Sequence, residues 1–432
     1  MISHAQKHDR RPVDEDVAPL AAEGRRVLYL SYDGLTDPLG RSQILPYLVG
    51  VAARGHRITL VSCEKPERLA ADGKILRELC ERSGIDWHPL RFRKRPPVVS
   101  SIIDVLQMKL HATVLIRRKG FDLVHCRSYM AGLVGHSLKL RFGVPFLFDM
   151  RGFWADERME RGFWPSGNPL FRFAYRCFKQ WEAQFFRDAD AIVSLTDSAR
   201  KEVESWPEPR RPRGPVSVIP CCVDLELFDP ANGHARQAGR TRLGLSDDLP
   251  IMLYVGSLGP GYVIDAMFGL FRAFRAVRPG ARYLFVSNHS RAEILALAQP
   301  YGIEPHEIIN VAGRRDEMPA LIATGDIGVS IIEPTFAAKA SCPTKVGEML
   351  AMGVPVVANS AVGDMAEIIG ESGAGAVLDR FDDQALAAAI ERIEGANINR
   401  DQVRAAARRW FALDDGVDRY DAIYRSIRSR RP

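Results

Sequence analysis

Short apolar runs alternate with stretches of helical periodicity along most of the chain. In the first half these runs are rich in Val, Ile, Leu and Phe, and they occupy residues 25–32, 56–63, 121–128, 144–150, 190–196 and 216–224. A helix-forming stretch separates the successive runs. Strands that alternate with helices are typical of βαβ units, so this half is predicted to form a parallel, doubly wound sheet.

The same alternation starts again after residues 225–250, a polar segment rich in Pro and Gly that we interpret as a linker. The later apolar runs occupy residues 251–258, 281–287, 307–313, 327–332, 354–360 and 374–379. The sequence therefore predicts an α/β protein with two Rossmann-like domains, residues 25–224 and 251–405. Doubly wound sheets bind ligands at the carboxyl ends of their strands, so two facing domains predict a central cleft.

The two ends of the chain follow a different pattern. Residues 1–24 are polar and lack the apolar core of a secretory signal, so we expect a disordered leader. Residues 406–432 carry aromatic side chains, including Trp410 and Tyr420, at helical spacing. Such a terminal helix can cross back to the first domain or stay with the second, and our domain assignment has it crossing back.

Composition is that of a soluble globular protein: 46% of the 432 residues are hydrophobic and 26% are charged. No apolar run looks long enough to span a bilayer. The formal net charge of +6 permits an anionic partner without requiring one, and we expect no nucleic acid. The seven cysteines are scattered without metal-ligand spacing, which indicates reduced thiols in a cytoplasmic protein. No motif for a metal or a cofactor stands out, and we expect neither.

Positive charge gathers in residues 91–119. The sequence RFRKRPP leads into a mixed apolar and basic segment that ends in IRRK. A basic amphipathic helix of this kind can lie on an anionic membrane surface. An ordinary domain helix with a charged outer face is the other interpretation, and base rates favour it.

Two loops of the first half offer polar groups at strand ends. The loop DGLTDPLGRSQ follows the first apolar run; Gly34 and Gly40 would allow close backbone approach to a ligand, and it also places three potential hydrogen-bonding side chains there, Arg41, Ser42 and Gln43. A tight turn is the alternative. The run 144–150 leads into Asp149, Arg151 and Trp154, and such a mixture of charged and aromatic groups suits sugar recognition.

The second half opens with a Gly-rich loop, YVGSLGPG, in which Gly256, Ser257 and Gly259 could hold a diphosphate. This loop contains no Lys or Arg, so the neutralising charge must come from another segment. Candidates are Arg314, Arg315, Lys339 and Lys345, although for each one taken alone a solvated or salt-bridged surface residue is the favoured interpretation.

The segment KASCPTKVGEMLAMGVPVV, residues 339–357, indicates a helix that opens near Pro343 and leads into a buried strand. With GDIGVSIIEP and SCPTKVGEMLAMGVPVVANSAVGDMAEII in view, the chain resembles the retaining GT-B glycosyltransferases of the group-1, family 4 type. The resemblance extends from about residue 25 to residue 427. It implies that the C-terminal domain binds a nucleotide-sugar donor and the N-terminal domain binds the acceptor. It also implies that Glu348, near the start of a helix, forms hydrogen bonds with the ribose of the nucleotide.

Three departures from the family pattern stand out. The resemblance places a sugar-gripping Glu at Ala340, the phosphate-binding Arg and Lys are missing after YVG, and the family's His is replaced within Asp149–Arg151. The sequence SCPTKVGE is similar to a variant found in enzymes of bacterial surface-polysaccharide synthesis. Sugar recognition must then differ from the family pattern or pass to Ser341, Thr344 or Lys339. Lys345 becomes a candidate phosphate ligand, with an i,i+3 ion pair to Glu348 as the alternative.

The expected activity is metal-independent transfer of a hexosyl-type unit, with retention, from a UDP- or GDP-sugar to a glycan or lipid-linked acceptor. Polysaccharide biosynthesis at the inner face of the membrane fits this activity. Asp149 and Arg151 join Glu348 as candidate catalytic residues. Two alternatives stay open, a nucleotide-sugar epimerase of related architecture and a catalytically silent subunit that binds nucleotide sugar.

Overall fold

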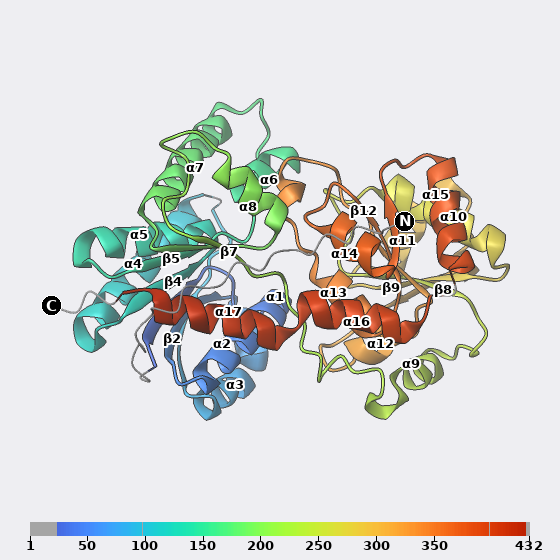
Figure 1. The fold of residues 1–432 in the computed structure, drawn as a ribbon, viewed down its shortest axis with the longest axis horizontal. Helices are drawn as coiled ribbons and strands as arrows, with labels where there is room; N and C mark the ends of the chain where they lie inside the picture. Colours follow the sequence, from blue (N-terminus) through green and yellow to red (C-terminus); the bar gives the residue numbers. More distant parts are fainter. Residues whose placement is uncertain (1–23, 97, 397, 429–432) are drawn as a thin grey trace, which may run out of the picture.

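The computed structural model describes residues 24–96, 98–396 and 398–428. The leader expected over residues 1–24 lies outside this part of the chain, apart from Gly24. Figure 1 shows two domains side by side, each with its own sheet and covering helices. This arrangement confirms the predicted GT-B architecture of two doubly wound α/β domains.

In the N-terminal domain parallel strands pair in the order β3-β2-β1-β4-β5-β6-β7. The strands are β1 (Arg26–Ser31), β2 (Arg57–Glu64), β3 (Ile85–Arg91), β4 (Leu123–Arg127), β5 (Phe146–Asp149), β6 (Ala191–Ser194) and β7 (Val216–Val218). The helices are α1 (Pro38–Gln43), α2 (Leu45–Ala53), α3 (Pro66–Arg82), α4 (Val99–Lys119), α5 (Ser128–Phe142), α6 (Trp154–Glu160), α7 (Pro169–Asp188) and α8 (Asp197–Glu204).

In the C-terminal domain parallel strands pair in the order β10-β9-β8-β11-β12-β13. The strands are β8 (Ile251–Val255), β9 (Arg282–Val286), β10 (Ile308–Val311), β11 (Ile327–Ser330), β12 (Val356–Asn359) and β13 (Gly375–Leu378). The helices are α9 (Ala235–Leu243), α10 (Ile264–Val277), α11 (Arg291–Ala298), α12 (Met318–Ala323), α13 (Thr344–Ala351), α14 (Met365–Ser372), α15 (Asp383–Gly395), α16 (Arg400–Phe411) and α17 (Leu413–Ser426), with 3-10 turns η1 (Asn232–His234), η2 (Gln299–Tyr301), η3 (Pro305–Glu307) and η4 (Ala337–Ala340).

Alternation of side chains along the central strands builds a core on both faces of each sheet. On β1, Leu28 and Leu30 pack into the layer under α4, α5 and α7, whereas Val27 and Tyr29 pack into the layer under α2, α3 and α17. Both faces are buried, and for this reason the strand reads as a continuous apolar run. The edge strand β3 is absent from the prediction because its sequence, IDWHPLR, mixes charged residues with a proline.

Two segments differ in detail from the predicted domain boundaries. The expected linker, residues 225–250, contains α9, which packs on α12 of the C-terminal domain. At the other end, α16 packs on α13, and the chain then bends at Ala412 so that α17 lies against α2 of the N-terminal domain. Figure 1 shows α16 and α17 following each other across both domains. The crossing helix thus begins at Leu413, later than the predicted boundary.

Contacts between the domains also form on the side opposite α17. The Asp364 carboxylate accepts hydrogen bonds from the backbone N–H groups of Asp197 and Ser198, at 2.7 and 2.9 Å, at the start of α8. A carboxylate at a helix N-terminus satisfies orphan N–H groups and opposes the helix dipole. The Thr196 hydroxyl donates to the Lys339 carbonyl at 2.7 Å. These bonds hold the segments before α13 and α14 against the N-terminal domain.

Helix α4 differs from the expectation that no apolar segment could span a bilayer. Within the described residues it is the one helix whose length and composition would suffice to cross a membrane. Arg117, Arg118 and Lys119 lie in its last turn, and Asp104 and Lys109 are the charged residues in the mostly apolar segment before them. One face, which includes Met108 and Ala112, packs on the sheet, whereas Leu106 and Leu110 on the other face are 53% and 70% exposed.

Candidate active site

The segment of residues 339–357 places α13 at the boundary of the two domains. Pro343 precedes the helix, where its fixed φ and missing N–H group cost nothing. The helix ends before Gly353, whose φ of +71° lets the chain turn into β12. Glu348 consequently lies in the second turn of α13, not at the helix start where the sequence pattern predicted it.

Glu348 is buried and is bound by a cation. Its carboxylate accepts a hydrogen bond from Arg315, which follows β10, and the Arg315 guanidinium also lies 4.6 Å from the ring centroid of Phe228. Burial raises the pKa of Glu348 above its ordinary value, although Arg315 and Lys345 favour the ionised carboxylate. The neighbouring candidate Arg314 points away, because its side chain is 80% exposed and pairs with Asp316.

Lys345 lies one helical turn before Glu348 and faces the Gly-rich loop. Its Nζ is 4.0 Å from the ring centroid of Tyr254 and 4.5 Å from that of Tyr262, so the ammonium is held by cation–π contacts. Burial lowers the pKa of Lys345, and Tyr262 partly opposes this effect. The Nζ also lies 3.3 Å from where a Cβ on Gly256 would stand, and Gly256 has a φ of +111°.

Position 256 therefore requires glycine, and Lys345 supplies the positive charge that the Gly-rich loop lacks. The other loop residues shape the turn. The Ser257 carbonyl accepts a hydrogen bond from the Tyr254 hydroxyl at 2.7 Å, and the Gly259 carbonyl accepts one from the Tyr262 N–H at 3.3 Å. Open space surrounds Gly259. The two tyrosines thus brace both the loop and the lysine.

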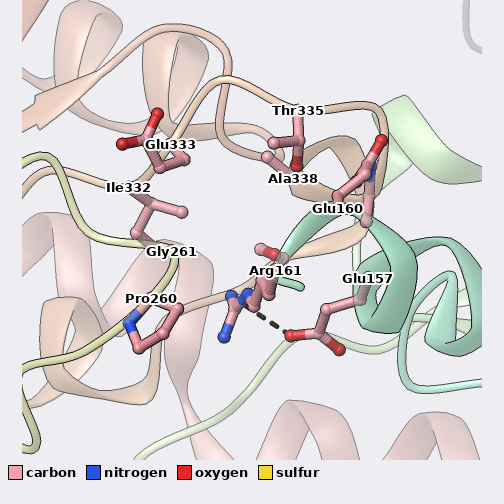
Figure 2. A pocket seen from close by; sticks show the side chains of 11 residues that line it. Glu157, Glu160, Arg161, Pro260, Gly261, Ile332, Glu333, Thr335 and Ala338 are labelled. Carbon is pink, nitrogen blue, oxygen red and sulfur yellow. Dashed lines mark hydrogen bonds and ion pairs between the residues drawn. The ribbon is translucent and has the colours of Figure 1, made fainter. Parts of the chain in front are cut away.

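A cavity of about 260 Å³ lies between the domains beside this loop. Figure 2 shows Arg161 and Glu157 of the N-terminal domain facing Gly261 and Glu333 of the C-terminal domain. Arg161 lies directly on Gly261, since its Nε is 2.7 Å from where a Cβ would stand. Ser341 also lines the cavity. The wall thus combines carboxylates with one guanidinium, groups that can bind sugar hydroxyls.

Asp149 and Arg151 reach the same boundary from the carboxyl end of β5. Asp149 is fully buried and accepts a hydrogen bond from the Tyr420 hydroxyl at 3.0 Å, while Arg151 Nη1 lies 3.8 Å from its other oxygen. Burial would raise the pKa of Asp149, but Arg151 and His125 outweigh it and the pKa is lowered. Arg151 has a φ of +57°, a conformation that non-glycine residues seldom adopt.

Two cysteines connect Arg151 to the start of α13, a link that the sequence pattern did not predict. Arg151 Nη2 lies 3.4 Å from Cys221 Sγ, and the Cys221 N–H donates to Cys342 Sγ at 3.3 Å. A hydrogen bond from Cys342 lowers the pKa of Cys221 to about 6; Arg151 and Arg127 assist, and burial opposes. Thr344, at the first position of α13, also bonds Cys221. The adjacent pair CCVD is the visible sequence signal.

The predicted acceptor loop is occupied by internal contacts. The buried Glu64 carboxylate accepts the N–H groups of Leu35 and Thr36 at 2.6 and 3.0 Å, and a Cβ on Gly34 would lie 2.7 Å from that carboxylate. A Cβ on Gly40 would lie 2.2 Å from the Gly34 carbonyl oxygen. Close contacts thus explain both glycines, and the contact of Gly40 with Gly34 lies within the loop, as in the tight turn that the sequence leaves open.

The polar residues of that loop and the nearby tryptophan have partners as well. Arg41 pairs with Asp72 at 2.7 Å, Ser42 donates to the Pro38 carbonyl, and Gln43 donates to the Cys222 carbonyl. One face of Trp154 is covered by the Arg158 guanidinium, 4.2 Å from the ring centroid. Arg41, Ser42, Gln43 and Trp154 therefore have partners within the protein, and their part in binding the acceptor stays a prediction.

Ala340 lies in the domain contact. It is 2% exposed and belongs to the same hydrophobic cluster as Met150 and Phe153 of the N-terminal domain. No room for a carboxylate side chain exists there without displacing that packing. Among the described residues, no three His, Cys, Asp or Glu side chains form a group that could hold a metal ion.

Comparisons with known proteins agree with this geometry. Residues 41–222 match the model of a glycosyl transferase 4-like domain, and residues 249–394 match that of glycosyl transferases group 1. The chain belongs to the group-1, family 4 glycosyltransferases. The first match spans the strand ends that carry Arg151, and the second spans Lys345 and Glu348.

Relatives of this glycosyltransferase include the D-inositol 3-phosphate glycosyltransferase of Thermomonospora curvata, 27% identical over 70% of this chain and 71% of the relative. Among solved structures, sucrose-phosphate synthase from Thermosynechococcus elongatus covers 93% of this chain and 98% of its own, with a TM-score of 0.69 and 17% identity. Anabaena HepE in complex with UDP-glucose covers 92% and 98%, with a TM-score of 0.65 and 15% identity. These two likenesses show the GT-B fold.

Proposed function

We propose that this glycosyltransferase transfers a sugar from a UDP- or GDP-sugar to an acceptor hydroxyl with retention of configuration and without a metal ion. The observation that carries the proposal is the placement of Lys345 and Glu348 on one face of α13, against Gly256 and Arg315. A cation over a Gly-rich loop suits a diphosphate, and a buried carboxylate suits ribose hydroxyls. Anabaena HepE, which has the same fold, forms a complex with UDP-glucose.

In this proposal the protein stabilises the leaving diphosphate and positions the sugar. Negative charge grows on the diphosphate as the glycosidic bond breaks, and Lys345 lies where it can meet that charge. Because burial lowers the pKa of Lys345, its ammonium is poorly compensated before the donor binds. Ser341 lines the cavity beside the loop, and Thr344 and Arg151 both adjoin Cys221, so we place the sugar near these residues.

For the acceptor we propose a glycan or lipid-linked molecule of bacterial polysaccharide synthesis. The relatives are D-inositol 3-phosphate glycosyltransferases by name, so a small phosphorylated polyol is a second candidate. The two differ in size, and a screen that contains both separates them.

We also propose that the enzyme works at the cytoplasmic face of the membrane, held by the outer face of α4. Apolar side chains on this face are exposed, namely Val99, Ile102, Ile103, Leu106, Leu110 and Val114. Arg91, Lys94 and Arg95 are exposed just before the helix, and Arg117, Arg118 and Lys119 are exposed at its end. An apolar stripe between basic clusters suits the interface of an anionic bilayer.

A donor screen tests the proposed reaction. UDP- and GDP-sugars are incubated with each acceptor class, and released nucleoside diphosphate is measured together with the anomeric configuration of the product. Acceptor-dependent release supports transfer. An isomeric nucleotide sugar formed without acceptor would indicate the epimerase instead, and tight donor binding without turnover would indicate a silent subunit. His125, the buried histidine an epimerase would need, is held by Tyr424 at 2.7 Å.

A further inference from the structure

Three arginine residues from three elements lie along the carboxyl edge of the N-terminal sheet, beside the candidate active site. Arg127 ends β4, Arg151 follows β5, and Arg158 belongs to α6. Arg127 Nε lies 3.5 Å from the Asp33 carboxylate. Burial lowers the pKa of Arg158, and the charge of Asp33 is among those that partly oppose this effect. Burial raises the pKa of Tyr29, and the charges of Arg127 and Arg151 both oppose this rise. We call Arg127, Arg151 and Arg158 the arginine cluster.

The cluster has buried N–H groups without hydrogen-bond partners. Arg127 is 3% exposed, and within the described part of the chain both its Nε and its Nη1 lack a partner. The same holds for the Nε atoms of Arg151, whose side chain is 8% exposed, and of Arg158. Leaving donors of a buried cation unsatisfied costs stability, so proteins seldom do it without a function.

Nearby acids compensate only part of this positive charge. Asp149 Oδ1 lies 3.8 Å from Arg151 Nη1, and Asp149 Oδ2 accepts a hydrogen bond from the Tyr420 hydroxyl. Cys221, beside Arg151, can take up a negative charge of its own, since the Cys342 thiol lowers its pKa to about 6. Arg127 then lies against Asp33, whose contact with it lies outside hydrogen-bond geometry. The Arg158 guanidinium lies 4.2 Å from the ring centroid of Trp154, which stacks on Tyr129, two residues after Arg127.

We propose that the arginine cluster binds a phosphate group carried by the acceptor substrate. A guanidinium presents parallel N–H donors that match phosphate oxygens, and two of them beside one carboxylate leave room for a dianion. The cluster lies at the carboxyl ends of β4 and β5, where doubly wound sheets bind ligands. The Asp33 side chain is 42% exposed, so a ligand can approach from that side.

The cluster also adjoins the donor side. Arg151 contacts Cys221, and Cys221 contacts Cys342 immediately before α13. A phosphate held by Arg127 and Arg158 would thus fix an acceptor within reach of the sugar. A phosphomonoester on a small polyol and a phosphate that links a glycan to a lipid offer this same chemistry. The inference rests on the proposed function, because it assigns a substrate group to that reaction.

Inorganic phosphate is the probe that tests the cluster directly. Thermal unfolding of the full chain is measured against phosphate concentration at constant ionic strength, with saturating UDP or GDP to fill the donor site. We expect phosphate to raise the Tm of the wild type and to leave that of Arg127→Met unchanged. Without phosphate, Arg127→Met should unfold at the same or a higher temperature, because an uncompensated buried charge is gone.

Arg240→Met is the control matched in burial. Arg240 is 1% exposed, and its Nε, like that of Arg151, lacks a partner among the described residues, but its Nη1 and Nη2 donate to the Ser246 and Thr324 carbonyls, so its loss should lower the Tm at every phosphate concentration. If Arg127→Met does not fold, the partly exposed Arg158→Leu takes its place. A phosphate response in Arg127→Met or Arg158→Leu equal to that of the wild type would overturn the proposal.

Turnover assays identify the source of the phosphate. If a polyol phosphate is the acceptor, Arg127→Met should raise the KM for that acceptor at least tenfold and leave the KM for the dephosphorylated polyol unchanged. If a lipid-linked phosphate is the acceptor, the same substitution should raise the KM for the lipid-linked acceptor at least tenfold. Loss of kcat alone, at unchanged KM for both acceptors, would contradict the proposal. If neither UDP nor GDP binds the wild type, the proposed function fails, and the phosphate titration without nucleotide still decides whether the cluster binds phosphate.

Discussion

Arg315 donates a hydrogen bond to the carboxylate of Glu348, and this contact joins the loop after β10 to the second turn of α13. The carboxylate is thereby fixed in orientation while it is almost fully buried. A buried acid with one cationic partner keeps capacity to accept further hydrogen bonds. The Glu348 carboxylate can therefore accept hydrogen bonds from the hydroxyl groups of a bound nucleotide sugar.

Glu348→Gln should weaken binding of the cognate nucleoside diphosphate about 10- to 100-fold, since hydrogen bonds to a charged group contribute about 1.5–3 kcal/mol. Calorimetric titration measures this. The amide keeps the shape of the carboxylate, so the fold should persist.

Stability provides the control for Glu348→Gln. Burial raises the pKa of Glu348, so in the range just above its ordinary pKa the folded state holds the proton more tightly than the unfolded chain. The free energy of unfolding of the wild type thus falls as pH rises through this range, and the substitution removes that fall. A variant that loses binding should be at least as stable as the wild type at pH 7.5. A lower Tm with normal binding would contradict the role given to Glu348.

Lys345→Met should lower the affinity for a nucleoside diphosphate at least about tenfold and leave that for the nucleoside alone unchanged, because the lysine faces the loop that holds the phosphates. Methionine can keep the packing between Tyr254 and Tyr262. Lys339→Met is the matched control: it removes a nearby lysine whose side chain pairs with Glu202. Equal losses for nucleoside and diphosphate would point to a folding defect instead.

Ala340→Glu restores the residue that the family pattern places there, and we expect it to damage the protein. The new carboxylate would enter a buried cluster shared with Met150 and Phe153. An uncompensated buried charge costs about 3–5 kcal/mol. Urea unfolding measures the loss. Ala340→Gln tests the contribution of the charge, since it has nearly the same volume. Higher turnover in Ala340→Glu would show that sugar recognition does use this position.

Sequence patterns predicted the strands that are buried on both faces, because such strands must be apolar throughout. The edge strand β3 was not predicted. It pairs only with β2, so its sequence can be less apolar and can include Pro89. Helix α9 was not predicted for a related reason. Its sequence, ARQAGRTRL, is polar and shows no apolar period, and its packing on α12 stabilises it instead.

The site divides in the same way. Lys345 and Glu348 share a helix, so the i,i+3 spacing was enough to place them on one face. Arg315 could be named only as one of several candidates, because a loop side chain may point either way until the fold directs it. Arg127 and Cys221 could not be found from spacing at all. They meet Arg151 only because β4, β5 and the segment after β7 end at the same edge of the sheet.

Leu106→Gln combined with Leu110→Gln should reduce binding to vesicles that contain phosphatidylglycerol about 100-fold, because burying each leucine in the interface would contribute about 1.5 kcal/mol or more. The control is Ile75→Gln with Leu79→Gln on α3, two side chains that are 66% and 41% exposed in the same domain. Flotation at low and high salt measures both pairs, and salt should weaken the wild type through its basic clusters. Equal flotation of the two double variants would exclude α4 as the membrane contact.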